Sequence, residues 1–307
     1  MGVGKCINLT QLRLLSEVCC LKSKKSMKKG LILEGGAMRG MFTAGVLDVL
    51  MENGIEFDGA IGVSAGATFG CNIKSRQPGR AIRYNKRFAH DWRYCSLRSL
   101  LATGDLYGAD FCYNILPHQL DIFDLDTYRQ NPMEFWVVAS DCETGKPIYK
   151  RLDTCDDRDL AWMRASASMP LASRIVEIDG YKLLDGGITD SIPLQYFKSI
   201  GYDRNVVVLT QPRTYRKGSN RLMWLMRLVL RRYPMIIKSL RDRHLEYNRT
   251  TAEVHNLANK GEVLVICPET PLNISRTSKN PDEMQRVYDE GRRIAKAQID
   301  TIKQFTE

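Results

Sequence analysis

The amino-acid sequence predicts an α/β fold. Short apolar runs alternate with segments of helical periodicity, which is the pattern of strands that pair into a sheet and of helices that cover it. The composition, with 44% hydrophobic and 26% charged residues in a chain of 307, is typical of a globular protein with an ordinary core. No Ser/Gly- or Pro-rich linker divides the chain, so we expect one large domain with a helical appendage.

The first half of the chain predicts a strand, a helix, a second strand and a second helix in turn. The first helix ends at Asn53-Gly54, a suitable terminus because glycine adopts the left-handed backbone without strain. Residues 79–120 have a mostly helical pattern and are rich in aromatic residues. The expected elements are a buried strand at 30–33, a helix over 41–53, a strand at 57–62 and a helix from 64 to about 74.

The second half of the chain supplies the remaining strands. A strand at 135–139 leads to a turn at Thr144-Gly145, which predicts a hairpin. The other expected elements are a helix over 157–168, strands at 181–184, 205–210 and 262–267, and one long closing helix over 282–305.

Residues 1–27 are predicted to be a poorly ordered N-terminal extension in front of a domain that spans residues 28–307. Their apolar part contains Arg13 and Glu17 and is followed by no small-residue cleavage site, unlike a signal peptide. No run approaches the roughly 20 uninterrupted apolar residues that a membrane-spanning helix needs. The nine cysteines are scattered and never spaced C-x-x-C, which argues against a zinc site and a secreted disulfide framework, so we expect a cytoplasmic protein.

The positive charge is concentrated in one segment. The net charge is +10, and residues 213–243 hold ten lysines or arginines and a single acid, Asp242. This balance favours an anionic partner, and since no nucleic-acid-binding motif accompanies it, a phospholipid surface is preferred over nucleic acid. The basic helical segment, at about 213–245, is broken by Pro234. It fits an interfacial helix on anionic lipid at the inner face of the membrane, or a helix that covers the sheet with a solvated basic face.

A glycine-rich loop follows the first strand. It reads Glu34-Gly35-Gly36-Ala37-Met38-Arg39-Gly40 and opens a helix. Glycines there let the chain turn tightly and expose backbone N–H groups at a helix N-terminus, which favours an anion. The loop lacks the third glycine of a dinucleotide fingerprint and the Gly-Lys-Ser/Thr of a nucleoside-triphosphate loop, so neither ligand is expected.

The motif Gly62-Val63-Ser64-Ala65-Gly66 lies between the second strand and the second helix. It is a G-x-S-x-G nucleophile elbow, in which the serine sits on a strained turn and small neighbours avoid clashes. Ser64 is therefore a candidate nucleophile, and a serine that only caps the helix is the alternative interpretation.

A third motif, Asp185-Gly186-Gly187, ends a late strand. Glycines beside a carboxylate let another backbone segment approach, although Asp-Gly is also a frequent turn pair. A serine nucleophile needs an adjacent base, which is most often a histidine that follows the last strand. No histidine follows residues 262–267, so a dyad of Ser64 with Asp185 fits the chain better than a triad with histidine.

These three motifs, in this order and at these spacings, resemble those of the patatin-like phospholipases of the bacterial type. The stretch R-A-S-A-S-M-P at residues 164–170 also resembles that family, and the match extends over about residues 27–193. One departure is Ala37, where the family usually has glycine; alanine keeps the N–H as long as the backbone there needs no positive φ. The resemblance implies a three-layer α/β/α sandwich with a mostly parallel central sheet.

The resemblance also implies roles for the motif residues. Ser64 would be the nucleophile and Asp185 the base. Arg39 would steady the loop or attract a phosphate, unless it is only a solvated cation at the helix start. The oxyanion donors would be the backbone amides of Gly35, Gly36 and Ala37, and the other motif glycines are Gly40, Gly62, Gly66, Gly186 and Gly187.

The expected function is therefore that of a serine acyl hydrolase of the lipase or phospholipase type, acting on carboxylic esters of lipids. One alternative is an esterase or thioesterase for soluble acyl substrates. Another is a non-catalytic lipid-binding module, which would require the dyad to be broken. No metal-binding motif is found and no cofactor is expected, and the sequence leaves the head group, the acyl chain and the oligomeric state undefined.

Overall fold

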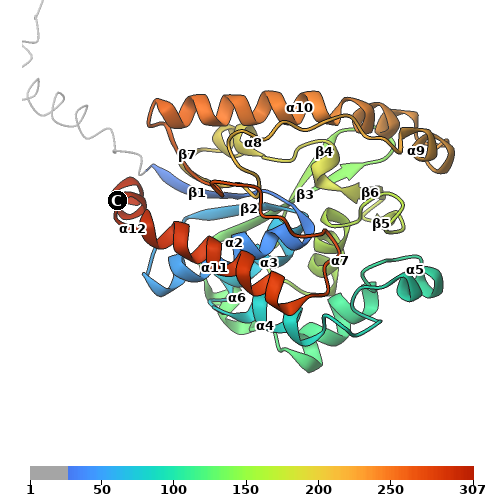
Figure 1. Ribbon diagram of the computed structural model, residues 1–307, viewed down its shortest axis with the longest axis horizontal. Coiled ribbons are helices and arrows are strands. Elements are labelled where there is room, and N and C mark those ends of the chain that lie inside the picture. Colours follow the sequence, from blue (N-terminus) through green and yellow to red (C-terminus); the bar gives the residue numbers. More distant parts are fainter. Residues whose placement is uncertain (1–26) are drawn as a thin grey trace, which may run out of the picture.

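A central sheet organises residues 27–307, which are the residues that the computed structural model describes (Figure 1). The expected N-terminal extension, residues 1–27, lies outside them except for Met27. The strand order is β5-β6-β3-β2-β1-β7-β8, with β4 paired to β3. The strands are β1 Lys28–Leu33, β2 Gly59–Val63, β3 Glu134–Asp141, β4 Pro147–Arg151, β5 Val176–Ile178, β6 Tyr181–Asp185, β7 Tyr202–Val208 and β8 Val263–Ile266.

Most strand pairs are parallel. β1 pairs in parallel with β2 and β7, β2 with β3, and β7 with β8. The β3–β4, β3–β6 and β5–β6 pairs are antiparallel. Parallel strands need helical crossovers that cover both faces of the sheet, which explains why β2 and the buried part of β1, residues 30–33, carry no polar side chain.

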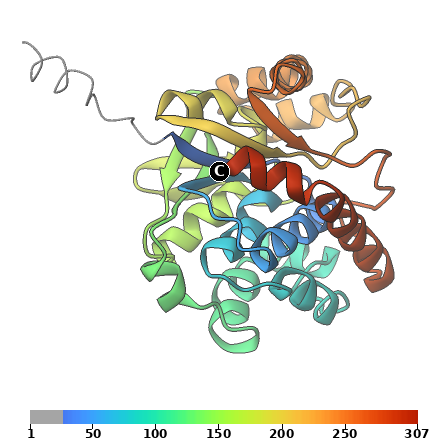
Figure 2. The same cartoon turned by 90° about the vertical axis from the view of Figure 1, so that its left-hand side faces the viewer.

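Helices cover the sheet on both faces. α2 (Gly40–Glu52), α3 (Ala65–Lys74) and α11 (Pro281–Ala297) lie on one face, and α8 (Leu194–Ser199) and α10 (Pro234–Asn259) lie on the other (Figure 1). Figure 2 shows the same layers from the side, with α10 seen end-on above the sheet. The expected three-layer α/β/α sandwich with a mostly parallel central sheet is confirmed.

Each face of the sheet has its own apolar core. Leu31 and Leu33 of β1 join the core beneath α2 and α11, whereas Ile32 joins the core beneath α8 and α10. This alternation follows from the two-residue period of a strand. Two glycines bring α2 and α11 together: a β-carbon on Gly45 or Gly291 would clash with a carbonyl of the facing helix.

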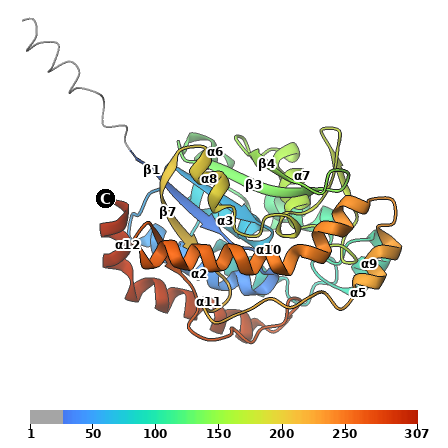
Figure 3. The same ribbon diagram turned by 90° about the horizontal axis from the view of Figure 1, so that it is seen from above.

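The remaining helices flank these layers: α5 and α9 lie beyond the end of the sheet where the parallel strands terminate, whereas α12 lies at the opposite end (Figure 1). Figure 3 places α9 and α5 at the same end of the molecule, as Figure 1 does. No helix among residues 27–307 is long and apolar enough to cross a bilayer. These elements are α4 Arg80–Arg87, α5 Leu97–Thr103, the π-helix η2 Phe111–Leu120, α6 Leu125–Gln130, α7 Asp157–Ser166, α9 Met223–Val229, α12 Ile299–Thr306 and the short 3-10 turns η1 Ala37–Arg39 and η3 Gly186–Ile188.

One helical expectation needs correction. The single closing helix over 282–305 is in fact two helices, α11 and α12, because the backbone of Gln298 leaves the helical region with φ −106° and ψ 6°. The basic segment is divided at Pro234 as expected, and this proline begins the second helix, where its missing N–H costs no hydrogen bond. The sequence did not predict β5, α6 or α8, which are all short.

The register of β3 positions two of the candidate site residues. Val138 of β3 pairs with Val63, the last residue of β2, and the next residue, Ala139, pairs with Asp185 at the end of β6. β6 runs antiparallel to β3, so its end meets the end of β2. Ser64, which directly follows β2, is thereby brought beside Asp185 at the carboxyl edge of the parallel strands, where α/β sheets usually bind ligands.

Candidate active site

Ser64 is held in an unusual backbone conformation between β2 and α3. Its φ of 55° and ψ of −120° are rare for a residue other than glycine, as expected of a nucleophile elbow. The Ser64 N–H donates to Oγ of the buried Ser166 at 3.0 Å. A β-carbon on Gly62 would clash with the backbone of Gly66, and one on Gly66 would clash with the carbonyl of Leu33, so the turn requires both motif glycines.

The glycine-rich loop packs directly against the serine. A β-carbon on Gly35 would lie 2.8 Å from Cβ of Ser64 and 2.7 Å from the carbonyl oxygen of Val63. Within residues 27–307, no hydrogen bond uses the backbone N–H of Gly35 or Gly36. The two amides are thus available to an acceptor beside the serine, which is what stabilisation of an oxyanion requires.

The loop is anchored by residues that sequence reasoning missed. The buried carboxylate of Glu34 accepts hydrogen bonds from Thr210 N–H at 2.6 Å and from the Tyr247 hydroxyl at 2.7 Å. The Thr210 hydroxyl donates to the carbonyl of Gly35 at 3.0 Å. Thr210 follows β7 and Tyr247 lies on α10, so no local pattern linked them to the loop.

Ala37 and Arg39 complete the loop. Ala37 has φ 49°, so the backbone there does adopt the left-handed conformation that glycine prefers. Nε of Arg39 is buried and has no hydrogen-bond partner among the described residues. A β-carbon on Gly40 would lie 2.8 Å from the ring of Phe69, which lets the start of α2 pack closely on α3.

Asp185 is buried at the end of β6. Its Oδ1 accepts a hydrogen bond from the Gly187 N–H at 2.8 Å, and its Oδ2 has no partner of standard geometry among the described residues. Burial raises the pKa of the Asp185 carboxyl, and the charge of Arg243, the Ser64 hydroxyl and the Gly187 N–H each lower it. The free oxygen therefore belongs to a carboxylate that faces the candidate nucleophile.

The stretch at residues 164–170 is hydrogen-bonded to both Ser64 and Asp185. Oγ of Ser166 accepts from the Ser64 N–H, and the carbonyl of Ser168 accepts from the Asp185 N–H at 2.8 Å. The Ser168 hydroxyl in turn donates to the carbonyl of Arg164 at 2.8 Å, which closes the end of α7. These contacts explain why small hydroxyl residues occupy alternate positions of this stretch.

No histidine is hydrogen-bonded to Ser64 or Asp185 among the described residues. His244 lines the opening of the cavity described next, but its Nδ1 lies 3.0 Å from the carbonyl oxygen of Arg241. The arrangement thus offers a carboxylate, not an imidazole, beside the serine.

A cavity of about 650 Å³ opens in front of Ser64, within the range of about 300–1,000 Å³ that is usual for small-molecule sites. It runs along α3 from Ser64 to Cys71, which is about 10 Å at 1.5 Å per residue. No group of three potential metal ligands occurs among residues 27–307. The inner walls are mostly apolar and include Phe69, Tyr84, Leu116, Phe123, Leu160 and Met163.

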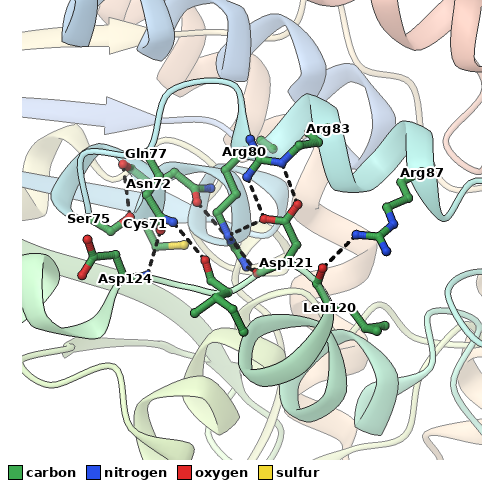
Figure 4. A network of polar contacts seen from close by, with 12 residues as sticks. Cys71, Asn72, Ser75, Gln77, Arg80, Arg83, Arg87, Leu120, Asp121 and Asp124 are labelled. Carbon is green, nitrogen blue, oxygen red and sulfur yellow. Dashed lines mark hydrogen bonds and ion pairs between the residues drawn. The ribbon is translucent and has the colours of Figure 1, made fainter.

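Charged side chains also reach the inner wall, and the protein itself neutralises them: Arg164 lies 3.2 Å from the buried Asp105, and Arg80 has a carboxylate partner of its own. Arg80 pairs with the buried Asp121, with Nε 3.2 Å from Oδ1, and Arg83 approaches the same carboxylate with two hydrogen bonds of 2.8 Å (Figure 4). Arg80 also donates to Oδ1 of Asn72 at 3.1 Å and to the carbonyl of Asp121 at 2.6 Å. This network closes the wall and leaves Arg80 few donors for a ligand.

The opening of the cavity is cationic. Lys217, Arg243 and Arg276 line it, and none of them takes part in an ion pair formed by the described residues. Burial lowers the pKa of Lys217 to about 7, with further lowering by the charge of Arg243. Burial also lowers the pKa of Arg243, whereas the charge of Asp185 raises it. The sequence placed two of these cations in the basic segment but did not show that they point inward.

Comparison with known proteins identifies the family. The family model for patatin-like phospholipase matches residues 31–198, which is more than half of the chain, so the protein belongs to the patatin-like phospholipase family. A second model, a domain of unknown function (DUF6363), matches residues 233–307. The first match includes Ser64 and Asp185, and the second includes α10, α11 and α12.

Individual relatives are distant. The uncharacterized protein YjjU of Escherichia coli is 31% identical over 201 residues, which cover 59% of this chain and 52% of that protein. Lysophospholipase nte1 of Aspergillus oryzae is 30% identical over 182 residues, which cover 57% of this chain and 11% of that protein. The chain therefore matches about half of the bacterial relative and a small part of the fungal one. The crystal structure of VipD from Legionella pneumophila aligns with 90% of this chain and 67% of that one, at 14% identity and a TM-score of 0.45.

Proposed function

We propose that the protein is a serine acyl hydrolase that cleaves carboxylic esters of lipids, with Ser64 as the nucleophile and Asp185 as the base. One observation carries the proposal. Ser64, on its strained turn, faces a buried carboxylate with an unpartnered oxygen at the head of an apolar cavity. Membership of the patatin-like phospholipase family supports the same reaction class.

In the first half of the reaction, Asp185 accepts the Ser64 proton as the hydroxyl oxygen attacks the ester carbonyl. The negative charge that develops on the carbonyl oxygen is stabilised by the N–H groups of Gly35, Gly36 and Ala37. The N-terminus of α3, which begins at Ala65, adds a favourable dipole. The proton then passes from Asp185 to the departing alcohol, and the acyl group remains on Ser64.

In the second half, water replaces the alcohol. Asp185 accepts a proton from the water as its oxygen attacks the acyl-enzyme, and it returns the proton to Ser64 as the carboxylic acid leaves. A carboxylate is an intrinsically weak base for this step. Burial of Asp185 raises its pKa and so makes it a stronger base, while the nearby charge of Arg243 lowers the pKa and helps to keep the group ionised.

The cavity supports a lipid substrate. Its apolar inner walls suit an acyl chain, since each buried methylene contributes about 0.8 kcal/mol. A soluble short-chain ester would leave most of these walls uncovered. We therefore favour a lipid ester over the short acyl substrates of a soluble esterase or thioesterase.

We also propose a peripheral contact with anionic membrane through residues 213–243. Trp224 and Leu228 of α9 are 66% and 62% exposed, and the exposed arginines Arg227, Arg231 and Arg232 lie beside them. Exposed apolar residues next to basic ones are typical of interfacial helices. At the same end of the molecule, α5 adds Leu101, which is 88% exposed (Figure 1, Figure 3).

The decisive experiment is labelling with a fluorophosphonate, which reacts with an activated serine. We expect one label per wild-type chain and none in Ser64→Ala, together with release of long-chain fatty acid from phospholipid vesicles. Persistence of the label in Ser64→Ala would refute the nucleophile. Hydrolysis of short aryl esters with no release of long-chain fatty acid would favour the soluble esterase instead.

A further inference from the structure

The cationic opening of the cavity differs from the ion-paired arginines elsewhere on the described surface. Exposed arginines elsewhere on the chain, such as Arg158 and Arg249, are paired with carboxylates at 2.6 Å. Lys217, Arg243 and Arg276 line one cavity and form no such pair among residues 27–307. Lys217 and Arg243 are partly buried and Arg276 is exposed. Partly buried cations without an ion pair are costly, which makes the cluster a candidate site for an anion.

Arg243 reaches the site from α10. A β-carbon on Gly187 would lie 3.0 Å from Nη2 of Arg243 and 3.0 Å from Oδ1 of Asp185, so the guanidinium lies close to the carboxylate. Nε of Arg243 is nevertheless buried, with no hydrogen-bond partner in the described part of the chain. A planar fork of donors with an unsatisfied N–H suits two oxygens of a phosphate group.

Two hydrogen bonds between the backbone of Lys217 and the side chain of Asn248 hold Lys217 in place. Its N–H donates to Oδ1 of Asn248 at 2.8 Å, and Nδ2 of Asn248 donates back to its carbonyl at 3.0 Å. The Lys217 ammonium lies 4.4 Å from the centre of the Tyr247 ring. The charged groups that act on it are Arg243, Glu34, Arg39 and Arg276, of which only Glu34 is acidic, and that carboxylate already accepts from Thr210 and Tyr247.

We propose that Lys217, Arg243 and Arg276 form a subsite for the phosphate group of an acyl ester substrate, and that this subsite selects head groups that carry no cation of their own. The inference rests on the proposed function and refines it. An acyl chain in the apolar cavity and a phosphate at its opening would place the ester bond between them, next to Ser64. A quaternary ammonium or amine head group would add a fourth cation to this cluster and be repelled.

All three residues lie outside the region that the patatin-like model matches, residues 31–198. Arg243 and Arg276 lie within the domain of unknown function at residues 233–307. The subsite therefore assigns that region a role in completing the active site and choosing the head group.

The test compares two esters that differ only in the phosphate: 1-octanoylglycerol and 1-octanoylglycerol 3-phosphate. We expect wild type to favour the phosphate ester about tenfold or more in kcat/KM, as charge-assisted hydrogen bonds would provide. Lys217→Met and Arg276→Gln should each reduce that preference about tenfold, through a KM that rises far more for the phosphate ester than for the neutral ester. Arg249→Gln, which removes a cation on the outer side of α10, is the matched control. Arg243 is a poorer target because it also lowers the pKa of Asp185.

Further arms separate the possible outcomes. Equal kcat/KM on the two esters in wild type, or equal losses on both in the variants, would overturn the subsite while leaving the hydrolase intact. A phosphocholine ester that reacts as well as the phosphate monoester would overturn the selection against cationic head groups. Inorganic phosphate should compete only weakly with the phosphate ester. A different result would show that the site takes free phosphate and not a head group: wild type does not prefer the phosphate ester, and inorganic phosphate inhibits hydrolysis of the neutral ester in wild type but not in Lys217→Met.

Binding can be measured without turnover. We expect Ser64→Ala to bind the ether analogue 1-octylglycerol 3-phosphate in calorimetry, and the Ser64→Ala/Lys217→Met double variant to bind it about tenfold more weakly. Should wild type hydrolyse none of the esters, the proposed function fails, and this titration still decides the subsite. Equal binding by both variants would overturn it.

Discussion

Gly35 lies so close to Ser64 that a β-carbon on the glycine would be 2.8 Å from Cβ of the serine. The contact joins the loop after β1 to the turn after β2, two strands that pair in parallel. It places the N–H of Gly35, which no hydrogen bond within residues 27–307 uses, beside the candidate nucleophile. The glycine is therefore required by close approach, because Gly35 itself does not adopt a positive φ.

Replacement of this glycine should separate activity from folding. In Gly35→Ala the added methyl group pushes the loop away from Ser64 and moves the oxyanion donors. We expect kcat to fall by about 10²–10³, as when one oxyanion donor is lost. The measurement is ester hydrolysis with thermal unfolding recorded in parallel. Near wild-type kcat in a folded Gly35→Ala would contradict the assigned oxyanion loop.

The strained turn at Ser64 predicts a difference between two inactive variants. Glycine accepts φ 55° and ψ −120° more readily than alanine, since strain of this kind costs about 1–3 kcal/mol. We expect Ser64→Gly to be more stable than Ser64→Ala by about 1 kcal/mol after the entropic cost of glycine in the unfolded chain. Chemical denaturation of the two variants checks this, and equal stability would argue against strain at the elbow.

Ala37 offers a test in which activity is retained. An L-residue in the left-handed region, such as Ala37, costs about 1–2 kcal/mol more than glycine does. The greater conformational entropy of glycine in the unfolded chain offsets part of this difference. Ala37→Gly should therefore stabilise the protein by roughly 0.5–1 kcal/mol and preserve hydrolysis, because the N–H stays in place. Denaturant unfolding and ester turnover give both readouts. Destabilisation would mean that the methyl group of Ala37 contributes packing that outweighs the strain.

The raised pKa of Asp185 predicts how activity and stability depend on pH. Because the folded-state pKa exceeds that of an unfolded aspartate, the stability contributed by the neutral acid is present below the unfolded pKa and is lost as pH rises through the folded value. Asp185→Asn resembles the neutral acid, so it should be inactive and more stable than wild type at pH 7. The difference in Tm should shrink towards acid pH. Thermal unfolding from pH 4 to 8 tests this, and a difference that does not change with pH would contradict it.

The membrane contact is tested by reversing charge on α9 and its C-terminal side. The triple variant Arg227→Glu, Arg231→Glu and Arg232→Glu should lose co-sedimentation with vesicles of phosphatidylglycerol and phosphatidylcholine, since each basic residue near an anionic surface contributes about 1 kcal/mol.

A matched control makes the same charge change at Lys260, Lys296 and Lys303, which are exposed near the opposite end of α10 and on the C-terminal helices (Figure 1). The control triple should sediment like wild type. Equal loss of sedimentation in both triple variants, or binding that does not depend on the content of anionic lipid, would contradict the membrane contact. The basic segment would then only cover the sheet, with its basic face in solvent.

The sequence predicted most of the fold because the fold depends on local patterns. The alternation of apolar strands and helices is confirmed from β1 to β3 and from β6 to β8, as is the hairpin formed by β3 and β4. The short elements β5, α6 and α8 were missed because three to six residues are too few to show a period. The break at Gln298 was missed because neither proline nor glycine marks it.

The roles assigned to Ser64, Asp185 and the loop at residues 35–37 remain predictions for the experiments above. The motifs named these residues because each one requires glycine or a small residue at a fixed local spacing. Thr210, Tyr247 and Ser166, which hold the loop and the serine, carry no such local signal.

The sequence by itself determined the layered α/β fold and the three motifs, since hydrophobic period and glycine placement act over a few neighbouring residues. Only the tertiary structure decided that Ser64 and Asp185 meet, because this depends on the register of β2 and β6 against β3. It likewise divided the basic segment: Arg227, Arg231 and Arg232 face solvent, whereas Lys217 and Arg243 face the cavity. The number of charged residues can be read from the sequence, but the direction in which each charged side chain points depends on packing between residues far apart in the sequence.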